Sequence, residues 1–355
     1  MSKDVLKMNP HKGAGETERC IEGNNNVMVL ELNNVTKNYD GFKLDNVSFS
    51  VPMGCICGFI GQNGAGKTTT IQLILDIIKK DSGDIKVLGG NMSKAAEKLK
   101  NRIGIVYDEM CFHDFLSPKQ INSVMKDIYD KWDEKLFFEY MDKFGLPKKK
   151  RCGAFSRGMR MKLQIAVAMS HGAELLIMDE PTSGLDPIVR NEILQIFQEF
   201  VMEENHTILL SSHITGDLER LADMVVFIDK GRIILAGDKN EILEKHGLVK
   251  CRKEDLEKIE QRDIVSARKS AFCTEIMVKD REAFKKKYSH ICETAAVEQS
   301  TLEEIMIFYT GAQRCGGDNV GKPDVQHCGG DDVGKPDAQH CAEDDMSRLS
   351  AQNKE

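Results

Sequence analysis

The sequence of 355 residues lacks any long hydrophobic run. No apolar segment approaches the roughly 18 residues that a membrane-spanning helix needs, so we do not expect the chain to cross a membrane by itself. The polar segment 1–20 has no apolar core, which argues against a secretory signal. An excess of positive charge is also lacking, because 49 Lys and Arg stand against 56 Asp and Glu and give a formal net charge of −7. This acidic balance gives no indication of a nucleic-acid partner.

Disulfide bonds are not expected either, although the chain contains 11 cysteines. They are scattered along a large chain, and Cys55 and Cys57 lie in an apolar segment where a reduced thiol behaves as a small hydrophobic group. We therefore expect free thiols in a reducing cytosol. A hydrophobic fraction of 41% and a charged fraction of 30% are typical of a folded protein with one large domain or two ordinary ones.

Residues 27–237 alternate between short apolar segments and segments with helical periodicity. This alternation predicts an α/β core with a largely parallel sheet. A helix-rich stretch interrupts it and predicts a helical insertion at about residues 110–170. We expect strands at 27–33, 47–51, 55–60, 103–107, 174–178, 206–211 and 224–228, and core helices at 68–79, 187–203 and 214–222.

The two ends of the chain do not continue this pattern. Residues 1–26 are polar and are expected to be disordered. Residues 238–310 mix charged helical stretches, at 239–245 and 252–261, with short apolar ones. They predict a small C-terminal α/β appendix.

The tail, residues 311–355, carries a repeat of 13 residues, CGGDNVGKPDVQH followed by CGGDDVGKPDAQH. Two polar copies are too few to bury a core, so we expect the tail to be disordered. The pairs His327-Cys328 and His340-Cys341 could bind zinc, but metal ligands usually cluster more tightly. Tandem duplication of a linker explains the repeat as well.

The loop after the strand 55–60 matches the phosphate-binding pattern G-x-x-x-x-G-K-[ST] in full and opens a predicted helix. Its glycines let backbone N–H groups turn toward phosphates, and the helix N-terminus adds its dipole. Lys67 is predicted to reach the β- and γ-phosphates and Thr68 to ligate Mg²⁺. The candidate nucleotide-binding residues here are Gly61, Gln62, Asn63, Gly64, Ala65, Gly66, Lys67, Thr68 and Thr69.

Two adjacent carboxylates, Asp179 and Glu180, end a buried apolar strand. Such a position is costly unless a cation or base chemistry requires them. Asp179 is predicted to hold Mg²⁺, directly or through water. Glu180 should point elsewhere because side chains alternate along a strand, and it suits a general base for the attacking water. The following Pro-Thr-Ser-Gly-Leu-Asp-Pro makes this common pair specific.

The combination and order of these motifs resemble the ATP-binding subunits of ABC transporters over about residues 27–235. The resemblance implies a P-loop NTPase core with a mostly parallel sheet, an antiparallel β subdomain and an inserted α-helical subdomain. ATP and Mg²⁺ are the implied ligands. Tyr39 occupies the position of the aromatic ring that stacks on adenine, and His213 matches the switch histidine that contacts the γ-phosphate. Taken singly, Tyr39 could also pack locally and His213 could be an ordinary polar residue.

Two turns are implied to act across a dimer interface. Ser156, Gly158 and Met159 fall on the signature turn, which in this family binds the γ-phosphate held by a second subunit. The segment Ser183–Asp186 resembles the D-loop, which crosses the interface and makes Asp186 a candidate.

Two positions depart from the commonest family pattern. The signature usually ends in Gly-Gly-Gln, whereas this chain has Ser156-Arg157-Gly158-Met159. The Q-loop usually has a Gln that touches Mg²⁺ and the attacking water, and Asp108 aligns best with it. A carboxylate also ligates Mg²⁺, so Asp108 is a candidate catalytic and metal-binding residue. The alternative is that Asp108 is only a polar loop residue and that hydrolysis is slower.

The departures and the segment 302–309 resemble the ABC-2 type exporters. This implies an ATP-hydrolysing subunit that dimerises head to tail at the cytoplasmic face of the membrane. It would energise export through a separate membrane permease docked near residues 109–131. The alternative is a soluble ABC ATPase acting in translation or DNA repair, but its usual second cassette, long coiled coil or zinc-binding insertion is not visible here. A P-loop kinase would leave the signature turn and His213 unexplained.

Overall fold

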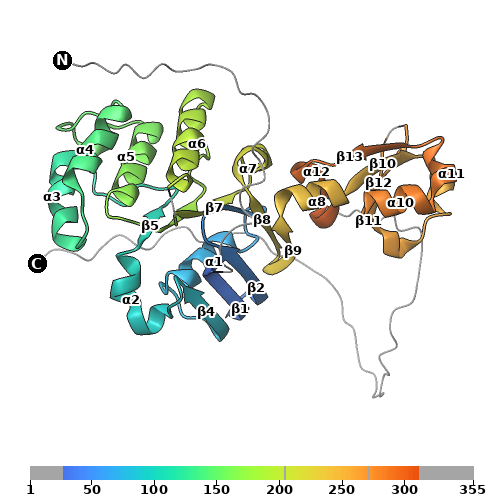
Figure 1. Cartoon of the computed structure of the whole chain (residues 1–355), viewed down its shortest axis with the longest axis horizontal. Helices are drawn as coiled ribbons and strands as arrows, with labels where there is room; N and C mark the ends of the chain where they lie inside the picture. Colours follow the sequence, from blue (N-terminus) through green and yellow to red (C-terminus); the bar gives the residue numbers. More distant parts are fainter. Residues whose placement is uncertain (1–26, 204, 271, 312–355) are drawn as a thin grey trace, which may run out of the picture. The chain divides into compact units, whose positions relative to one another are not determined.

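The protein is described from a computed structural model, which describes residues 27–203, 205–270 and 272–311. Its central sheet has six strands in the order β5-β6-β7-β3-β8-β9. Figure 1 labels β5, β7, β8 and β9 of this sheet. The first five are mutually parallel, and only β9 runs antiparallel to its neighbour. The strands are β3 (Ile56–Ile60), β5 (Ile103–Val106), β6 (Leu175–Asp179), β7 (Thr207–Ser212), β8 (Met224–Asp229) and β9 (Arg232–Asp238).

The central sheet is buried on both faces, and alternate residues of one strand enter two different cores. In β6, Leu176 and Met178 pack with the helices α5, α6 and α7, whereas Leu175 and Ile177 pack against α1 and an antiparallel sheet. Burial on both faces explains why these strands read as continuous apolar runs. The helices are α1 (Lys67–Ile74), α5 (Arg157–Met169), α6 (Pro187–Val201) and α7 (Thr215–Leu221). The predicted α/β fold is confirmed.

The antiparallel sheet has the order β2-β1-β4. It consists of β1 (Met28–Tyr39), β2 (Phe42–Pro52) and β4 (Ser82–Val87), followed by α2 (Met92–Lys100). The predicted strands 27–33 and 47–51 are correct but too short, because polar residues continue both strands to the turn at Asp40-Gly41.

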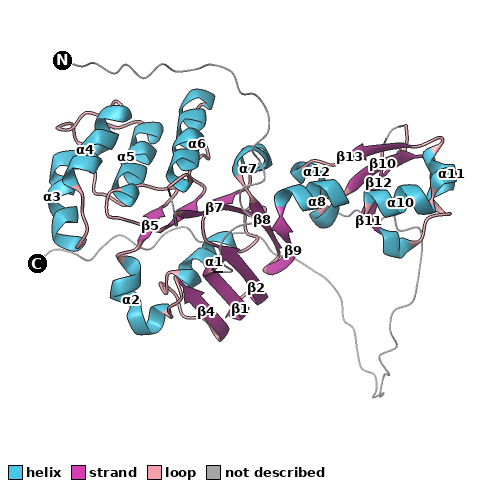
Figure 2. Cartoon of the chain, in the orientation of Figure 1, coloured by secondary structure: helices cyan, strands magenta, loops and turns pink. Residues whose placement is uncertain are grey.

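The helical lobe contains α3 (Pro118–Ile128), α4 (Glu134–Lys143) and a short 3-10 turn, η1 (Cys152–Ala154), before α5 (Figure 2). Each helix begins at a side-chain cap: Ser117 in a capping box with Gln120, Asp133 for α4 and Ser156 for α5. These caps satisfy N–H groups that a helix start leaves without partners.

Residues 239–310 contain a second antiparallel sheet with the order β11-β12-β10-β13 and its own hydrophobic cluster. Its last helix, α12, packs against α7, and the Leu302 N–H donates to Glu219 Oε1 at 2.6 Å. The strands are β10 (Gly247–Cys251), β11 (Ile264–Lys269), β12 (Thr274–Val278) and β13 (Ala296–Gln299). The helical elements are α8 (Lys239–Lys245), α9 (Lys253–Leu256), η2 (Gln261–Asp263), α10 (Arg281–Lys287), α11 (Ser289–Cys292) and α12 (Leu302–Thr310).

Two predicted helices are too long. The helix predicted at 68–79 ends at Ile74, and Asp76 has a positive φ of 54° that no helix continues through. The helix predicted at 252–261 is confined to Lys253–Leu256 and a separate 3-10 turn. Residues 1–26 and 312–355 lie outside the described residues. The predictions of a disordered N-terminal segment, of a disordered tail with its repeat, and of the alternative zinc site fall on them.

Gly231 lies in the turn between β8 and β9 and connects this turn to the phosphate-binding loop and to β2. Its N–H donates to the carbonyl of Ala65 in the phosphate-binding loop at 2.9 Å, and its carbonyl accepts from the Asp45 N–H at 2.8 Å. The φ angle is +76°, and a Cβ would come 1.9 Å from the Lys43 carbonyl oxygen. Any side chain at this position must therefore move the β8–β9 turn away from β2.

Substitution of Gly231 by Ala is expected to destabilise the fold through this close approach. We expect a loss of roughly 2–4 kcal/mol in the free energy of unfolding, from backbone strain and steric overlap together. Gly41→Ala is the matched control, because Gly41 also has a positive φ (+83°) but no atom lies within 4 Å of the added Cβ. It should cost only about 1 kcal/mol. Urea unfolding measures both, and equal losses would contradict the role given to Gly231.

Candidate active site

The phosphate-binding loop runs from β3 into α1, and inside it the Ala65 N–H donates to the Gln62 carbonyl at 3.1 Å. Gly66 caps α1 with φ +114° and offers no side-chain acceptor, so the first N–H groups of the helix have no partner within it. Gly64 has φ +80°, and no atom lies within 4 Å of the place where a Cβ would stand. Such a loop at a helix N-terminus is suited to an anion.

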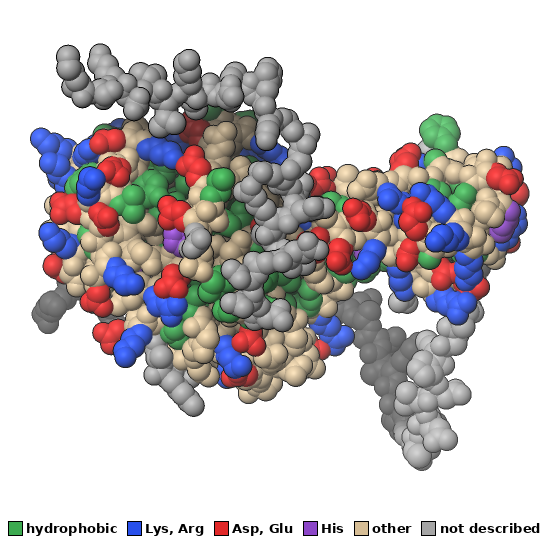
Figure 3. Space-filling view, viewed as in Figure 1, with side chains coloured by type: hydrophobic (Ala, Val, Ile, Leu, Met, Phe, Trp, Pro, Cys, Tyr) green, Lys and Arg blue, Asp and Glu red, His purple; other side chains and the backbone are tan. Residues whose placement is uncertain are grey.

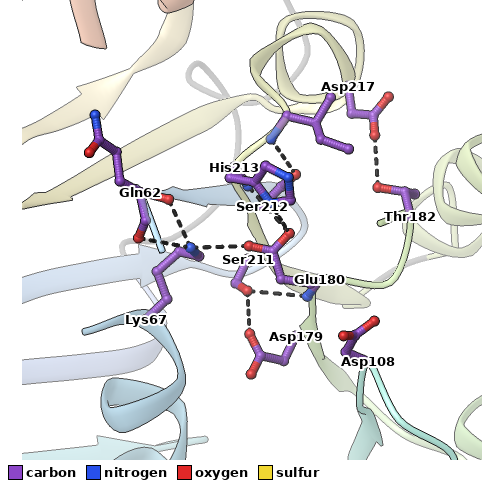
Figure 4. A network of polar contacts seen from close by, with 12 residues as sticks. Gln62, Lys67, Asp108, Asp179, Glu180, Thr182, Ser211, Ser212, His213 and Asp217 are labelled. Atoms are coloured by element: carbon purple, nitrogen blue, oxygen red, sulfur yellow. Dashed lines mark hydrogen bonds and ion pairs between the residues drawn. The ribbon is translucent and has the colours of Figure 1, made fainter. Parts of the chain in front are cut away.

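The Lys67 side chain is buried beside this loop. Its ammonium donates to the Gly61 carbonyl at 2.8 Å and to the Gln62 carbonyl at 3.4 Å. It also lies 3.1 Å from Glu180 Oε1 in an ion pair without hydrogen-bond geometry. Figure 4 shows Lys67, Glu180 and His213 directed toward one another. The cation therefore stands between the loop and the carboxylate that follows β6.

Asp179 accepts hydrogen bonds from two hydroxyl groups. Thr68 donates to its Oδ2 at 2.7 Å and Ser211 donates to its Oδ1 at 2.6 Å. Thr68 comes from the start of α1 and Ser211 from β7, where it is the residue paired with Asp179 across the sheet. A carboxylate and a hydroxyl are hard oxygen ligands, so this donor set fits Mg²⁺.

Glu180 adopts a strained backbone conformation with φ 53°. Its N–H lies 3.2 Å from the Ser211 carbonyl and 3.3 Å from the Ser211 hydroxyl. Its Oε2 lies 2.6 Å from His213 Nδ1, and the His213 N–H donates to the same oxygen at 3.4 Å. A left-handed conformation at a residue other than glycine costs about 1–3 kcal/mol and persists only where the surrounding structure imposes it. It turns Glu180 away from Asp179, but Glu180 lies beyond the end of β6, so the alternation along a strand that the sequence suggested is not the cause.

The signature turn and the D-loop lie against each other. Ser156 caps α5 by accepting from the Met159 N–H at 3.3 Å, and a Cβ on Gly158 would come 3.0 Å from Val189 in α6. Asp186 caps α6 and accepts from the Ile188 and Val189 N–H groups at 3.1 and 3.0 Å. In this chain, the carboxylate of Asp186 therefore supports its own helix.

Asp108 and Tyr39 stand apart from these contacts. Within the described residues, the Asp108 carboxylate pairs with Arg157 and makes no contact with Thr68 or Asp179. Burial raises the pKa of the neighbouring Tyr107 phenol, and Cys111 and Asp179 add to the shift.

Tyr39 ends β1 with 47% of its surface exposed, and the Lys37 ammonium lies 5.6 Å from its ring centre. An exposed ring at a strand end is accessible for stacking.

Sequence reasoning missed Ser211 and Arg157. Ser211 could have been found, because it stands on the strand next to Asp179 and immediately precedes the Ser-His pair. Arg157 carried no sequence signal, since its partner Asp108 lies 49 residues earlier.

A groove of about 790 Å³ opens beside Asp108 on the helical lobe. Figure 3 shows hydrophobic side chains gathered among charged ones over this lobe. Phe115, which lines the groove, is 63% exposed. The lining residues are Asp108, Glu109, Met110, Phe112, His113, Asp114, Phe115, Phe155, Arg157, Arg160, Met161 and Gln164.

Comparison with known proteins agrees with this geometry. The ABC transporter family matches residues 44–183. The bacitracin transport ATP-binding protein BcrA of Bacillus licheniformis is 38% identical over 212 residues, which cover 58% of this chain and 68% of BcrA. The linearmycin resistance ATP-binding protein LnrL of Bacillus subtilis is 35% identical over 226 residues, covering 62% of this chain and 72% of LnrL. The lantibiotic transport ATP-binding protein SrtF of Streptococcus pyogenes is 35% identical over 222 residues, covering 61% of this chain and 95% of SrtF.

Solved structures give the same result. An ATP-binding subunit of an ABC transporter superposes with a TM-score of 0.56 at 26% identity, covering 60% of this chain and 91% of that one. A dimeric ATP-binding cassette bound to ADP and Pi has the same fold, with a TM-score of 0.54 at 18% identity and coverage of 59% and 98%. The fold and the site define a P-loop ATPase. The chain belongs to the ATP-binding proteins of the ABC transporter family.

The strain at Glu180 predicts an unusual order of stability between two variants. Glu180→Gly and Glu180→Ala both remove the carboxylate and its contacts to Lys67 and His213, so they differ only in backbone freedom. Glycine adopts a positive φ without steric cost, so Glu180→Gly should be more stable than Glu180→Ala by roughly 1 kcal/mol.

The matched control is Glu199 in α6, which is an ordinary helical position. There Glu199→Gly should be less stable than Glu199→Ala by about 1 kcal/mol. Urea unfolding of the four variants checks the prediction, and the same order at both positions would remove the argument for strain at Glu180.

Proposed function

We propose that the chain binds and hydrolyses ATP with Mg²⁺ and is one of two ATPase subunits that energise export through a separate membrane permease. One observation carries the catalytic part of the proposal. Glu180 is held between Lys67 and His213, directly after the Asp179 carboxylate that Thr68 and Ser211 contact. The Lys67 ammonium, the candidate Mg²⁺ ligands Asp179 and Thr68, and the candidate base Glu180 thereby lie close together.

Each residue has a separate task in this proposal. Lys67 neutralises the β- and γ-phosphates from beside the loop. Glu180 accepts the proton of the attacking water, and His213 fixes the orientation of its carboxylate through Nδ1. Mg²⁺, held by Thr68 and Asp179, would neutralise charge on the phosphate oxygens. The nucleotide would supply further oxygen ligands beside the Asp179 carboxylate and the Thr68 hydroxyl. Among the described residues no group of three or more His, Cys, Asp and Glu side chains could hold a metal.

The second subunit would supply the signature turn. Ser156, Gly158 and Met159 would bind the γ-phosphate of ATP held by that subunit, and Tyr39 would stack on the adenine of the chain's own ATP. Asp186 would lie at the interface while capping α6. The dimeric cassette bound to ADP and Pi, which shares this fold, supports such an arrangement.

The export part of the proposal rests on the relatives and on the groove. Relatives named for bacitracin and lantibiotic transport and for linearmycin resistance support an antibiotic or a peptide as cargo. In the described ranges no helix is long and apolar enough to span a membrane. In this proposal the pore belongs to a separate permease chain. The groove, with exposed Phe115 among charged side chains, is the proposed seat of a cytoplasmic permease helix. The subunit would then work at the cytoplasmic face of the membrane.

Glu180→Gln tests the catalytic role directly. Removing the base should lower the rate of phosphate release by about 10²–10⁴-fold, while ATP binding persists and an ATP-bound dimer accumulates. Phosphate release, nucleotide titration and gel filtration with ATP measure these three results. Glu199→Gln, which changes an exposed carboxylate paired with Lys143, is the control and should behave as the wild type. Wild-type hydrolysis by Glu180→Gln would refute the assignment of the base.

Asp179→Asn tests the Mg²⁺ site. The amide keeps one acceptor oxygen, so it can accept from one of the Thr68 and Ser211 hydroxyls and donate to the oxygen of the other, but it loses the charge that attracts the ion. We expect Mg²⁺ to enhance nucleotide affinity by roughly tenfold less than in the wild type. Titration of a fluorescent ATP analogue with Mg²⁺ and with EDTA gives the measurement. An unchanged Mg²⁺ effect would argue against Asp179 as a ligand.

Fractionation of cells that express the tagged chain tests whether it acts at a membrane. Recovery of the tagged chain with membranes and a multi-span protein would support export. Recovery with ribosomes or DNA would instead support a soluble ABC ATPase.

A further inference from the structure

Arg157 connects three loops that the proposed mechanism treats separately. It is the first residue of α5, directly after the capping Ser156 of the signature turn. Its guanidinium pairs with the Asp108 carboxylate, which follows β5 at the Q-loop position. Arg157 and Asp108 lie in the two motifs that depart from the commonest family pattern, the signature turn and the Q-loop. In the structure these two motifs are joined by this ion pair.

The same guanidinium also lies against the D-loop. Gly184 has φ +65°, and a Cβ there would stand 3.0 Å from Arg157 Nη1 and 3.1 Å from its Cζ. The side chain that starts in the signature turn therefore passes over the loop after Glu180 before it reaches Asp108. A planar guanidinium with several donors can contact two sides at once, which a lysine ammonium does less well.

The pair also forms part of the groove on the helical lobe, because Asp108 and Arg157 both line it. The other charged groups there are Glu109, His113, Asp114 and Arg160. Arg160 is engaged elsewhere, since it donates to the Gly153 carbonyl at 3.1 Å and lies 3.6 Å from Asp114. Contact with a helix in the groove would thus reach Asp108 and Arg157 directly.

The pair contributes little to the stability of the fold. The side chains of Arg157 and Asp108 are 50% and 46% exposed, and exposed ion pairs are weak because water and salt screen them. An effect of these residues on activity would therefore reflect the placement of the loops.

We propose that Arg157 is a positioning residue that, through Asp108 and Gly184, couples the groove to the signature turn and to the loop after Glu180. This inference rests on the proposed function, in which the signature turn serves the ATP of a second subunit. It gives Asp108 a role as the anchor of Arg157 in place of a role as a Mg²⁺ ligand. It also keeps Arg157 away from direct contact with phosphate.

Charge reversal tests the coupling in the purified full-length chain. Arg157→Asp and Asp108→Arg each place like charges together and should lower kcat for ATP hydrolysis about tenfold. The KM for ATP should change less than about twofold, because the chain's own phosphate-binding loop is untouched. The double variant D108R/R157D restores an opposite pair and should recover kcat to within about threefold of the wild type.

The matched control is the exposed pair of Lys143 in α4 and Glu199 in α6, which also joins the helical lobe to the core domain. Reversing either charge there should leave kcat and KM unchanged. Thermal unfolding of all variants should agree within a few degrees, so a loss of activity cannot be assigned to misfolding.

The outcomes separate the possible failures. If the double variant stays as slow as the single ones, the coupling is refuted, and a direct role of Asp108 at Mg²⁺ or of Arg157 at phosphate explains the result. A parallel Mg²⁺ titration distinguishes these two roles, because only the loss of a metal ligand shifts the Mg²⁺ midpoint. If the wild type itself does not hydrolyse ATP, the proposed function fails before the inference is tested.

Discussion

The buried ammonium of Lys67 is the charge around which the active site is arranged. A buried cation is stable only with close partners. Lys67 obtains two loop carbonyls and the Glu180 carboxylate, and Glu180 in turn holds His213. These residues come from three distant parts of the sequence. They meet because β3, β6 and β7 are parallel neighbours, so that the loops following them emerge at one edge of the sheet.

Much of this arrangement could be predicted from the sequence, because the strands of the core are buried on both faces and the glycine loop has a fixed pattern. The limits of the elements were less predictable. The apolar Ile77 and Ile78 continue the helical pattern beyond the end of α1, while the backbone at Asp76 has already left it. The polar second half of β1 carries no strong strand signal in the sequence. Its length is set by its pairing with β2, which continues to Tyr39 and Phe42.

The side-chain partners were the least predictable part of the site. Asp186 followed by Pro187 is a recognisable helix start, yet the resemblance directed attention to the dimer interface. The pairing of Asp108 with Arg157 depends on how the helical lobe packs beside β5 and on the close approach at Gly184. No local pattern encodes a contact of that kind. Residues 239–310 show the same limit, because their antiparallel sheet forms from short segments of mixed character.

Gly231 illustrates how a residue outside the active site can constrain the position of its phosphate-binding loop. It lies 164 positions after Lys67, which is the difference between their residue numbers, yet its N–H supports the phosphate-binding loop through Ala65. Every amino-acid replacement that one base change can produce in a glycine codon adds at least a Cβ, and the Lys43 carbonyl leaves no room for one. In a survey of random mutants, loss-of-function changes should therefore accumulate at this codon as densely as at the catalytic carboxylate. A map of mutational tolerance alone would then misassign a structural turn to the active site.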